Sequence, residues 1–430
     1  MKFNTATLKN GLKVITIPML DNPAVTVLVM VETGSKYEKK EQSGLSHFLE
    51  HMVFKGTPKR PKAIDIAREL ESLGAQYNAF TSQEYTGYYA KVSPQHIDTA
   101  LDVVSDIYLH PLLDAAEIEK EKGVIVEEIR MYQDLPHRDV HDVFMSLVYG
   151  DQPAGWKIAG NEQTVKSFSQ NDFKKYISEH YVAESTIVIV SGSFDQKETL
   201  AKIEKAFAGI SQSKNSPKLA VQENQSKPEI AVKFKETDQS HLILGMRSYD
   251  AKSEYDSALT VLSTLLGGGM SSRLFQKLRE EMGVGYYIRA NQDSYTDHGL
   301  FTISAGVDTK RIEEVISTLI DECVKVINEP ISNEELKKVK DYISGSFVLG
   351  LETSDSQAEY CAVHQILKGK VENPTDEIAK IQKVTAEEVK DVARKIFVDE
   401  RLNLAIIGPY KDVEKEQQRF AKLLTFKTQK

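Results

Sequence analysis

The fold is decided by a stretch that occurs twice in this 430-residue chain, first as FSQNDFKKYISEHYVAESTIVIVSGSF at residues 168–194 and again as VTAEEVKDVARKIFVDERLNLAIIGPY at residues 384–410. The two stretches match in pattern without a gap. In each, a segment with helical spacing of apolar residues runs into a buried, β-branched strand that ends at a Gly turn. Such internal similarity predicts two copies of one α+β unit.

The same order of elements surrounds both copies. A strand precedes a helix, a Gly-led segment of strand character follows, and a long charged helix comes next. The corresponding ranges in the two halves are 22–35 and 240–250, then 73–92 and 282–307, then 94–108 and 308–327. Hairpin-like strands followed by clustered helices favour antiparallel pairing. The predicted fold class is α+β, with two homologous α/β-roll domains, each a mostly antiparallel sheet with helices packed on it.

A linker is predicted between the two halves. Residues 211–229, SQSKNSPKLAVQENQSKPE, lack hydrophobic periodicity and are rich in Ser, Asn, Gln, Lys and Pro, which is linker composition. The chain is also too long for one average domain. We therefore expect a first domain at residues 1–210 and a second at residues 230–430.

Composition excludes several classes of protein. Hydrophobic residues make up 41% of the chain and charged residues 27%, and the formal net charge of −9 disfavours a nucleic-acid partner. The two cysteines, Cys323 and Cys361, are too few for a disulfide framework, which favours a reducing compartment. Residues 1–20 contain neither a long apolar run nor an Arg-rich presequence, and no apolar stretch is long enough to span a membrane. We expect a cytoplasmic protein without a membrane partner.

The helix predicted within GLSHFLEHMVFKGT, residues 44–57, has a polar face of unusual chemistry. At 100° per residue, His47, Glu50 and His51 fall on one side. The opposite, apolar side is formed by Leu45, Phe48, Leu49, Met52 and Val53. Two imidazoles at i and i+4 can hold one tetrahedral metal ion, and the adjacent carboxylate can take a proton from metal-bound water. This is the inverted zinc-peptidase order His-x-x-Glu-His, although a solvated helix face is the usual interpretation of any one such histidine.

A third ligand is expected from EIEKEKGVIVEEIRMYQD, residues 117–134. Glu121 and Glu128 are seven residues apart and share one helical stripe, so one can bind the metal while the other supports a ligand. Spacing alone leaves Glu127 as a rival ligand. A Glu-rich helix that is merely solvated is the alternative.

A second histidine pair with the spacing of metal ligands lies in LPHRDVH, residues 135–141. His137 and His141 are also at i and i+4, but the base position of the inverted order holds no carboxylate, and Asp139 would have to serve. We interpret this segment as a surface turn running into a helix.

Six landmarks together resemble the pitrilysin family of inverted zinc metallopeptidases, which includes insulin-degrading enzyme and mitochondrial processing peptidase. In chain order they are TLKNGLKVIT, GLSHFLEHMVFKGT, NAFTSQEYTGYY, EKGVIVEEIRMYQD, GWKIAGNEQTVKSFS and LLGGGMSSRLFQKLREEMGVGYY. The resemblance covers nearly the whole chain. A two-domain length resembles the processing-peptidase branch and its small prokaryotic relatives.

The resemblance implies a role for each residue of the first half that matches the family pattern. His47 and His51 match the histidine ligands, and Glu50 matches the general base. Glu128 matches the distal glutamate ligand, because Glu121 lies seven residues before it as the accessory catalytic carboxylate of the family does. The implied cofactor is one Zn²⁺ per chain, held by a catalytic first domain.

The second half is expected to handle substrate without binding metal. The resemblance matches Arg279 and Tyr286 to a family pair that stabilises the oxyanion of the scissile carbonyl. When GLSHFLEHMVF is aligned with ALTVLSTLLGG, residues 258–268, the metal-binding helix loses its ligands. Val261 then takes the position of His47. Thr264 takes that of Glu50, and Leu265 that of His51.

A substrate-binding strand is expected at Asn78, Ala79, Phe80 and Thr81. The resemblance implies β-augmentation, in which an exposed edge strand hydrogen-bonds an extended peptide backbone. A strand covered by other elements is the alternative.

The predicted function is that of a zinc metalloendopeptidase that hydrolyses unfolded peptides inside a closed chamber. The metal motif and the Arg-Tyr pair occur in one chain, which favours a homodimer that acts on peptides alone. Two alternatives stay open: a non-catalytic scaffold subunit and a partner-dependent peptide-binding subunit of a processing-peptidase-like complex. Mn or Co can also occupy a site of this kind.

Overall fold

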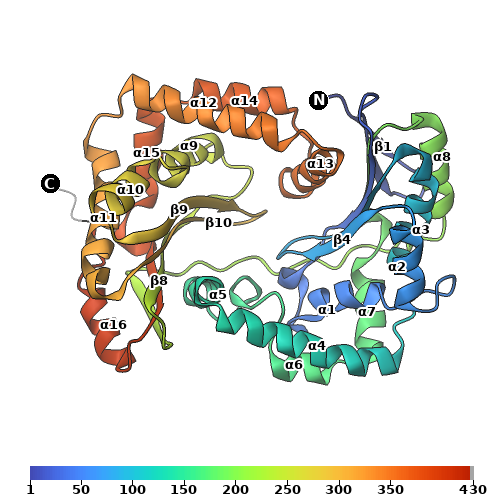
Figure 1. The fold of residues 1–430 in the computed structure, drawn as a ribbon, viewed down its shortest axis with the longest axis horizontal. Helices are drawn as coiled ribbons and strands as arrows, with labels where there is room; N and C mark the ends of the chain where they lie inside the picture. Colours follow the sequence, from blue (N-terminus) through green and yellow to red (C-terminus); the bar gives the residue numbers. More distant parts are fainter. Residues whose placement is uncertain (427–430) are drawn as a thin grey trace. The chain divides into compact units, whose positions relative to one another are not determined.

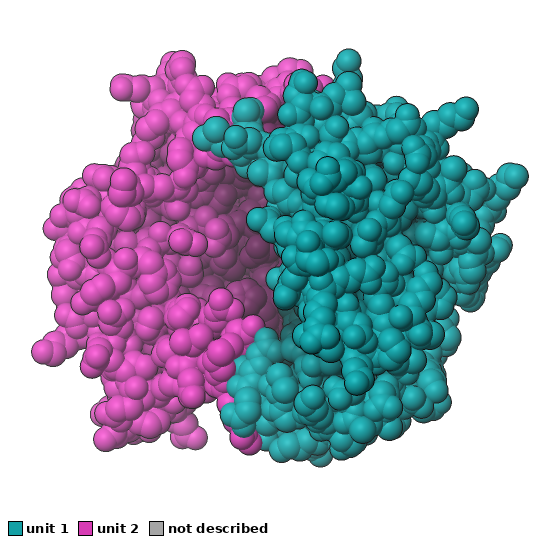
Figure 2. Space-filling view, turned by 45° about the vertical axis from the view of Figure 1, so that its right-hand side comes forward, with its two compact units in different colours: residues 1–129, 157–219, 348–373 teal, residues 130–156, 220–347, 374–430 magenta. Residues whose placement is uncertain are grey.

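Two mostly antiparallel sheets organise the computed structural model, which describes residues 1–426. The chain forms two compact units, each with one sheet, which Figure 2 shows in different colours. Unit 1 contains residues 1–129, 157–219 and 348–373, and unit 2 contains residues 130–156, 220–347 and 374–430. The predicted α+β class with two homologous sheet-and-helix domains is confirmed.

The sheet of unit 1 has six strands in the order β1-β2-β6-β3-β5-β4. Its two edge strands, β1 and β4, are labelled in Figure 1. Only β2 and β6 pair in parallel; the other neighbours are antiparallel. The strands are β1 (Asn4–Thr7), β2 (Lys13–Pro18), β3 (Val25–Val31), β4 (Gln76–Thr81), β5 (Thr86–Val92) and β6 (Thr186–Gly192). β4 therefore forms one edge of this sheet.

Helices cover both faces of this sheet, because its strands alternate two sets of apolar side chains. One set, including Val27 and Val29, packs against helices of the first half of the chain. These are α1 (Leu45–Val53), α2 (Ala63–Glu71), α3 (Ile97–Leu109), α4 (Ala115–Asp134), α7 (Gln170–His180) and α8 (Gln196–Ala206). The other set, including Leu28 and Met30, packs against α13 (Ser354–Lys368).

The sheet of unit 2 repeats this topology with five strands in the order β7-β11-β8-β10-β9. Again one neighbouring pair, β7 and β11, is parallel and the rest are antiparallel. The strands are β7 (Glu229–Phe234), β8 (Gln239–Ser248), β9 (Gly285–Ser294), β10 (Gly299–Asp308) and β11 (Leu402–Gly408). β9 holds the edge position that β4 holds in unit 1.

Helices again cover the two faces of the second sheet. Its main core involves α9 (Asp256–Gly267), α11 (Ile312–Asn328), α12 (Asn333–Gly350), α14 (Pro374–Lys383), α15 (Ala386–Ile396) and α16 (Val413–Ala421). The opposite face packs against α5 (Pro136–Tyr149), whose Phe144 ring lies over Gly245 of β8. A Cβ at Gly245 would be 2.3 Å from that ring, so a larger residue at this strand position would displace the buried Phe144 side chain.

The repeated stretch folds identically in both copies. α7, a short 3₁₀ turn and β6 in the first copy correspond residue for residue to α15, a 3₁₀ turn and β11 in the second. Both helices begin with a capping box, Ser169 with Asp172 and Thr385 with Glu388, which satisfies backbone N–H groups of the first turn. Both strands are buried at every position.

The compact units exchange one helix between the halves of the chain. α5, from the first half, packs on the second sheet, whereas α13, from the second half, packs on the first. No helix or strand lies between α8 and β7, a segment that contains residues 211–228 of the predicted linker, and the last linker residue, Glu229, begins β7. The domain limits of 1–210 and 230–430 remain a prediction. The two compact units themselves interleave along the chain. Within residues 1–426, none of the helices is long and apolar enough to cross a lipid bilayer.

Candidate metal centre

Helix α1 begins where a buried carboxylate caps it. Glu38 is only 2% exposed and accepts hydrogen bonds from the backbone N–H groups of Gly44 (2.8 Å) and Ser46 (2.6 Å). Gly44 has φ of 97°, and a Cβ there would be 2.7 Å from the carbonyl oxygen of Ala159. The predicted apolar side of the helix is completely buried. The start and rotation of α1 are thereby fixed, and its polar side turns away from the core.

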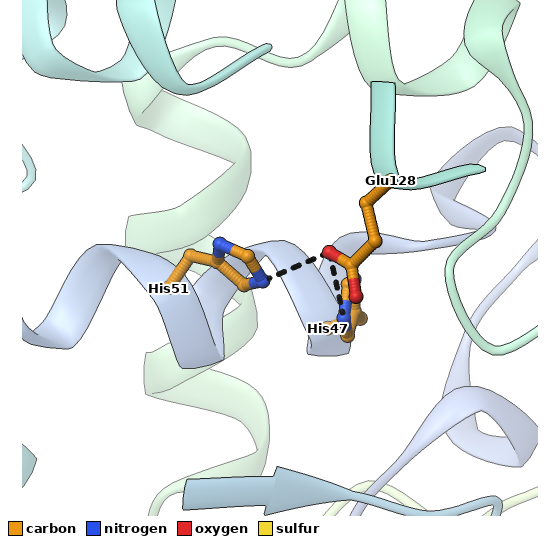
Figure 3. Close-up of side chains that lie close together, drawn as sticks. All are labelled: His47, His51 and Glu128. Carbon is orange, nitrogen blue, oxygen red and sulfur yellow. Dashed lines mark ion pairs between the residues drawn. The ribbon is translucent and has the colours of Figure 1, made fainter. Parts of the chain in front are cut away.

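Three candidate ligands lie together in unit 1 (Figure 3). Glu128 Oε2 lies 3.4 Å from His51 Nε2 and 3.8 Å from His47 Nε2, and one ligand atom of each residue lies within 4.8 Å of the other two. Donor atoms bound at about 2.0–2.1 Å to a tetrahedral zinc ion are about 3.3 Å apart. Two imidazole nitrogens and one carboxylate oxygen at this spacing fit a zinc ion that keeps an open fourth position.

The geometry also separates the two candidate glutamates of α4. Glu128 is half-buried and turns toward the two imidazoles, whereas Glu127 is exposed. Neighbouring residues of a helix project about 100° apart, so one side chain reaches the histidines and the other does not. The arrangement favours Glu128 as the third ligand.

Glu121 contacts one of the candidate ligands and is not itself part of the ligand group. Its Oε1 contacts His51 Nδ1 at 2.9 Å and its Oε2 contacts Lys55 Nζ at 2.5 Å, while its side chain is 4% exposed. Among residues 1–426, no hydrogen-bond partner reaches the buried Nδ1 of His47. Of the two imidazoles, only the ring of His51 is therefore held by a protein carboxylate at its second nitrogen.

The two histidines differ in their affinity for protons. Burial, together with the neighbouring His51, lowers the pKa of His47 to about 4. Burial also disfavours the charged form of His51, but hydrogen bonds to Glu121 and Glu128 raise its pKa to about 9. Metal ligands bind as neutral imidazoles, so a metal ion competes with a proton mainly at His51.

Glu50 lies beside this cluster and is held by the predicted substrate strand. Its Oε2 accepts a hydrogen bond from Thr81 Oγ1 at 2.5 Å. Burial raises the pKa of Glu50, and the bond from Thr81 opposes that change. A carboxyl whose pKa moves toward neutrality is suited to general base catalysis.

The predicted substrate strand lies in β4, at the edge of its sheet. Asn78 is exposed, Ala79 is buried, and Phe80 and Thr81 are half-buried. The side chain of Asn78 accepts a hydrogen bond from the backbone N–H of Ala79 at 2.9 Å. The edge position agrees with strand addition, while the binding role remains a prediction.

An open depression of about 360 Å³ borders Glu50 and His51. Apolar groups dominate its remaining wall, together with Lys55, Asn78 and Glu121. The apolar lining consists of Phe54, Ala63, Ile66, Ala67 and Tyr77. Its size suits one large side chain next to the candidate catalytic carboxylate.

Arg279 and Tyr286 lie in unit 2, close to each other in the chain. Arg279 Nη1 donates a hydrogen bond to the carbonyl oxygen of Gly285 at 2.8 Å, directly before Tyr286. Tyr286 stands on the edge strand β9 and is 62% exposed. Both side chains are exposed, and their catalytic role remains a prediction.

The structure also places the residues that the sequence disfavoured as ligands. His137 and His141 are exposed, but both lie within α5, which begins at Pro136, so the segment is helical where a surface turn was expected. In α9, Val261 and Leu265 are buried in the core. Within the described part of the chain, His47, His51 and Glu128 form the one group of three or more His, Cys, Asp or Glu residues spaced to hold a metal ion.

Sequence reasoning missed two residues of this region, Lys55 and Glu38. Lys55 follows His51 by four residues, about one helical turn, and this spacing was a usable signal. Glu38 lies before the helix in an irregular segment, and no periodicity pointed to it.

Comparisons with known proteins agree with this geometry. A family model described as Insulinase (Peptidase family M16) matches residues 13–162, and a model described as Peptidase M16 inactive domain matches residues 167–343. The chain is 35% identical over 406 residues to "Uncharacterized zinc protease YmxG" of Bacillus subtilis, covering 94% of this chain and 97% of that protein. It is 34% identical over 412 residues to an "Uncharacterized zinc protease" of Rickettsia felis, covering 95% and 98%.

Solved structures show the same fold. A protease from Helicobacter pylori superposes with a TM-score of 0.88 at 25% sequence identity, covering 95% of this chain and 99% of that one. A structure titled as a peptidase M16 inactive domain from Pseudomonas fluorescens has the same TM-score at 17% identity and supports the fold alone. The chain belongs to peptidase family M16, and the predicted resemblance to two-domain, pitrilysin-type proteins is confirmed.

Proposed function

We propose that this protein is a zinc metalloendopeptidase that cleaves unfolded peptides. The observation that carries the proposal is the joint placement of three ligand atoms and a half-buried carboxylate. His47, His51 and Glu128 are spaced for one zinc ion, and Glu50 stands beside them in a hydrogen bond with Thr81. The zinc protease names of the relatives support the same activity.

Each residue has a stated task in this proposal. Zinc held by the two histidines and Glu128 would supply a Lewis acid that polarises a peptide carbonyl and lowers the pKa of water. Glu50 takes the proton from the attacking water and delivers it to the leaving amine. Glu121 holds the ring of His51 by its Nδ1 atom.

Substrate binding is assigned to β4 and to the depression beside it. Residues 78–81 lie on an edge strand, which can add an extended peptide as a further strand. Backbone pairing of this kind depends little on the side chains of the peptide. We therefore propose broad specificity, with a preference for one large apolar side chain in the depression. Arg279 and Tyr286 are assigned the stabilisation of the oxyanion, in which donors favour developing negative charge.

The proposed partner is an unfolded peptide, and the proposed assembly is a homodimer that needs no other subunit. Both the candidate metal ligands and the Arg279 and Tyr286 pair occur in this one chain. Neither a nucleic acid nor a membrane is proposed as a partner.

The experiment that tests this proposal uses a quenched, mixed-sequence peptide of about 10 to 15 residues, long enough to cover an edge strand. Purified protein is loaded with zinc, its metal content is measured, and its cleavage rate is compared with that of Glu50→Gln. Zinc-dependent cleavage that the variant loses, while retaining its metal, supports the peptidase. No cleavage by a folded, zinc-loaded protein overturns it and favours a scaffold or a partner-dependent subunit.

A further inference from the structure

We propose that Lys55 is a positioning residue of the candidate metal centre, acting on His51 through Glu121. The inference rests on the proposed function, since it concerns the zinc site of that peptidase. It is carried by a chain of two polar contacts in unit 1. Lys55 Nζ contacts Glu121 Oε2 at 2.5 Å, and Glu121 Oε1 contacts His51 Nδ1 at 2.9 Å.

The two oxygens of Glu121 have separate partners, and this determines what Lys55 does. A carboxylate bound only through one oxygen can rotate about its terminal torsion, which is broad for glutamate. The ammonium group of Lys55 holds the second oxygen and so restricts that rotation. The first oxygen is thereby kept in line with the ring of His51, whose Nε2 faces Glu128.

Burial makes this contact stronger than an ordinary surface ion pair. The side chain of Glu121 is 4% exposed and that of Lys55 is 24% exposed. By contrast, Lys59, on the loop after α1, pairs with Asp102 of α3, and these side chains are 60% and 47% exposed. Exposed pairs contribute little, whereas removing one partner of a buried pair leaves the other without compensation.

His51 is the ligand for which such support matters most. The Nδ1 atom of His47 has no hydrogen-bond partner within residues 1–426, so no protein group holds its ring at that nitrogen. Carboxylates that hold a metal-binding histidine by its second nitrogen fix its tautomer and orientation. Loosening Glu121 would therefore disturb the orientation of His51, the candidate ligand whose ring contacts a carboxylate at both nitrogens.

The test measures zinc affinity, by competition with a chromophoric chelator, for the wild-type protein and five variants. Lys55→Met removes the ammonium group at similar length, and Lys55→Arg restores a cation. Lys59→Met is the matched control, because it removes an exposed lysine that also pairs with a carboxylate. Lys55→Met combined with Glu121→Gln, compared with Glu121→Gln alone, tests whether Lys55 acts through Glu121.

We expect Lys55→Met to weaken zinc binding about ten-fold, the lower end of the range for groups that support a ligand. Lys55→Arg should stay within about three-fold of the wild type, Lys59→Met should match it, and Lys55→Met should add little to Glu121→Gln. Melting of the metal-free variants identifies any loss of folding. If Lys55→Met has the same zinc affinity as the wild type, or if its effect adds fully to that of Glu121→Gln, the inference is wrong. A wild-type protein that fails to bind zinc would instead contradict the proposed function.

Discussion

The hydroxyl of Thr81 donates a hydrogen bond to the carboxylate of Glu50 across 2.5 Å, and this bond joins the edge strand β4 to helix α1. The candidate base and the candidate substrate strand are therefore one connected unit. A peptide added to β4 would extend along the residue that holds Glu50 in place. Binding and catalysis are coupled through this hydroxyl in the proposed mechanism.

Thr81→Val should lower the turnover of peptide about ten-fold. Valine keeps the shape of threonine but removes the donor, and a hydrogen bond to a charged group contributes about 1.5–3 kcal/mol. The measurement is kcat on the quenched peptide with zinc-loaded protein. Thr81→Ser, which keeps the hydroxyl, should retain most of the activity. Equal rates for Thr81→Val and the wild type would show that this bond does not support catalysis.

Zinc should stabilise the folded protein through Glu128 and not through Glu127. At free zinc of about a thousand times the dissociation constant, binding to the native state adds about 4 kcal/mol to the free energy of unfolding. Glu128→Gln should lose most of this gain, because a neutral amide replaces a charged ligand. Glu127→Gln, a matched change on the exposed side of α4, should keep it. Urea unfolding with and without zinc provides the measurement, and equal losses in both variants would contradict the assignment.

Much of the fold was accessible from sequence because the two copies of one unit share their local signals. The apolar spacing of α7 and α15 and the β-branched runs of β6 and β11 all agree with the structure. The exchange of α5 and α13 was not accessible. The apolar stripe of an amphipathic helix predicts that one face is buried, but it does not identify the sheet against which that face packs.

The same distinction applies to the candidate site. His47, Glu50 and His51 lie on one helix, so periodicity alone could place them on one face. Glu121 and Glu128 lie on another helix, and spacing could not choose between Glu128 and Glu127. The family resemblance, and not the spacing, matched Glu128 to the third ligand. The contact of Lys55 with Glu121 needed the distances in the structure.

Ile366→Ala should destabilise unit 1, although the residue belongs to the second half of the chain. Ile366 lies on α13, is 6% exposed, and packs in the cluster that covers β2, β3 and β6. Truncating a buried isoleucine costs about 2–5 kcal/mol. Urea unfolding of the whole chain measures the change, and zinc-dependent stabilisation reports on unit 1. Leu349→Ala, at a residue that is 73% exposed, should change stability by no more than about 0.5 kcal/mol. A comparable loss in both variants would argue against a specific role for the exchanged helix.

The stability of the protein should fall as the pH drops below about 6.5, in part because of His180. His180 is 3% exposed, lies against the ring of Tyr176, and places Nδ1 3.1 Å from Asn215 Oδ1. Burial lowers its pKa, although the bond to Asn215 and the charge of Glu179 oppose this change. The unfolded chain therefore binds a proton at a higher pH than the folded chain does. The stability that neutral His180 contributes is present above the ordinary pKa and is lost as the pH falls toward the lowered one.

The corresponding measurement is urea unfolding of metal-free protein between pH 7.5 and 5, for the wild type and His180→Gln. Glutamine keeps a donor for Asn215 but does not titrate, so the variant should show a shallower loss of stability. One proton changes the slope by at most about 1.4 kcal/mol per pH unit. If His180→Gln loses stability with acid as steeply as the wild type, His180 does not contribute to the acid sensitivity of the fold.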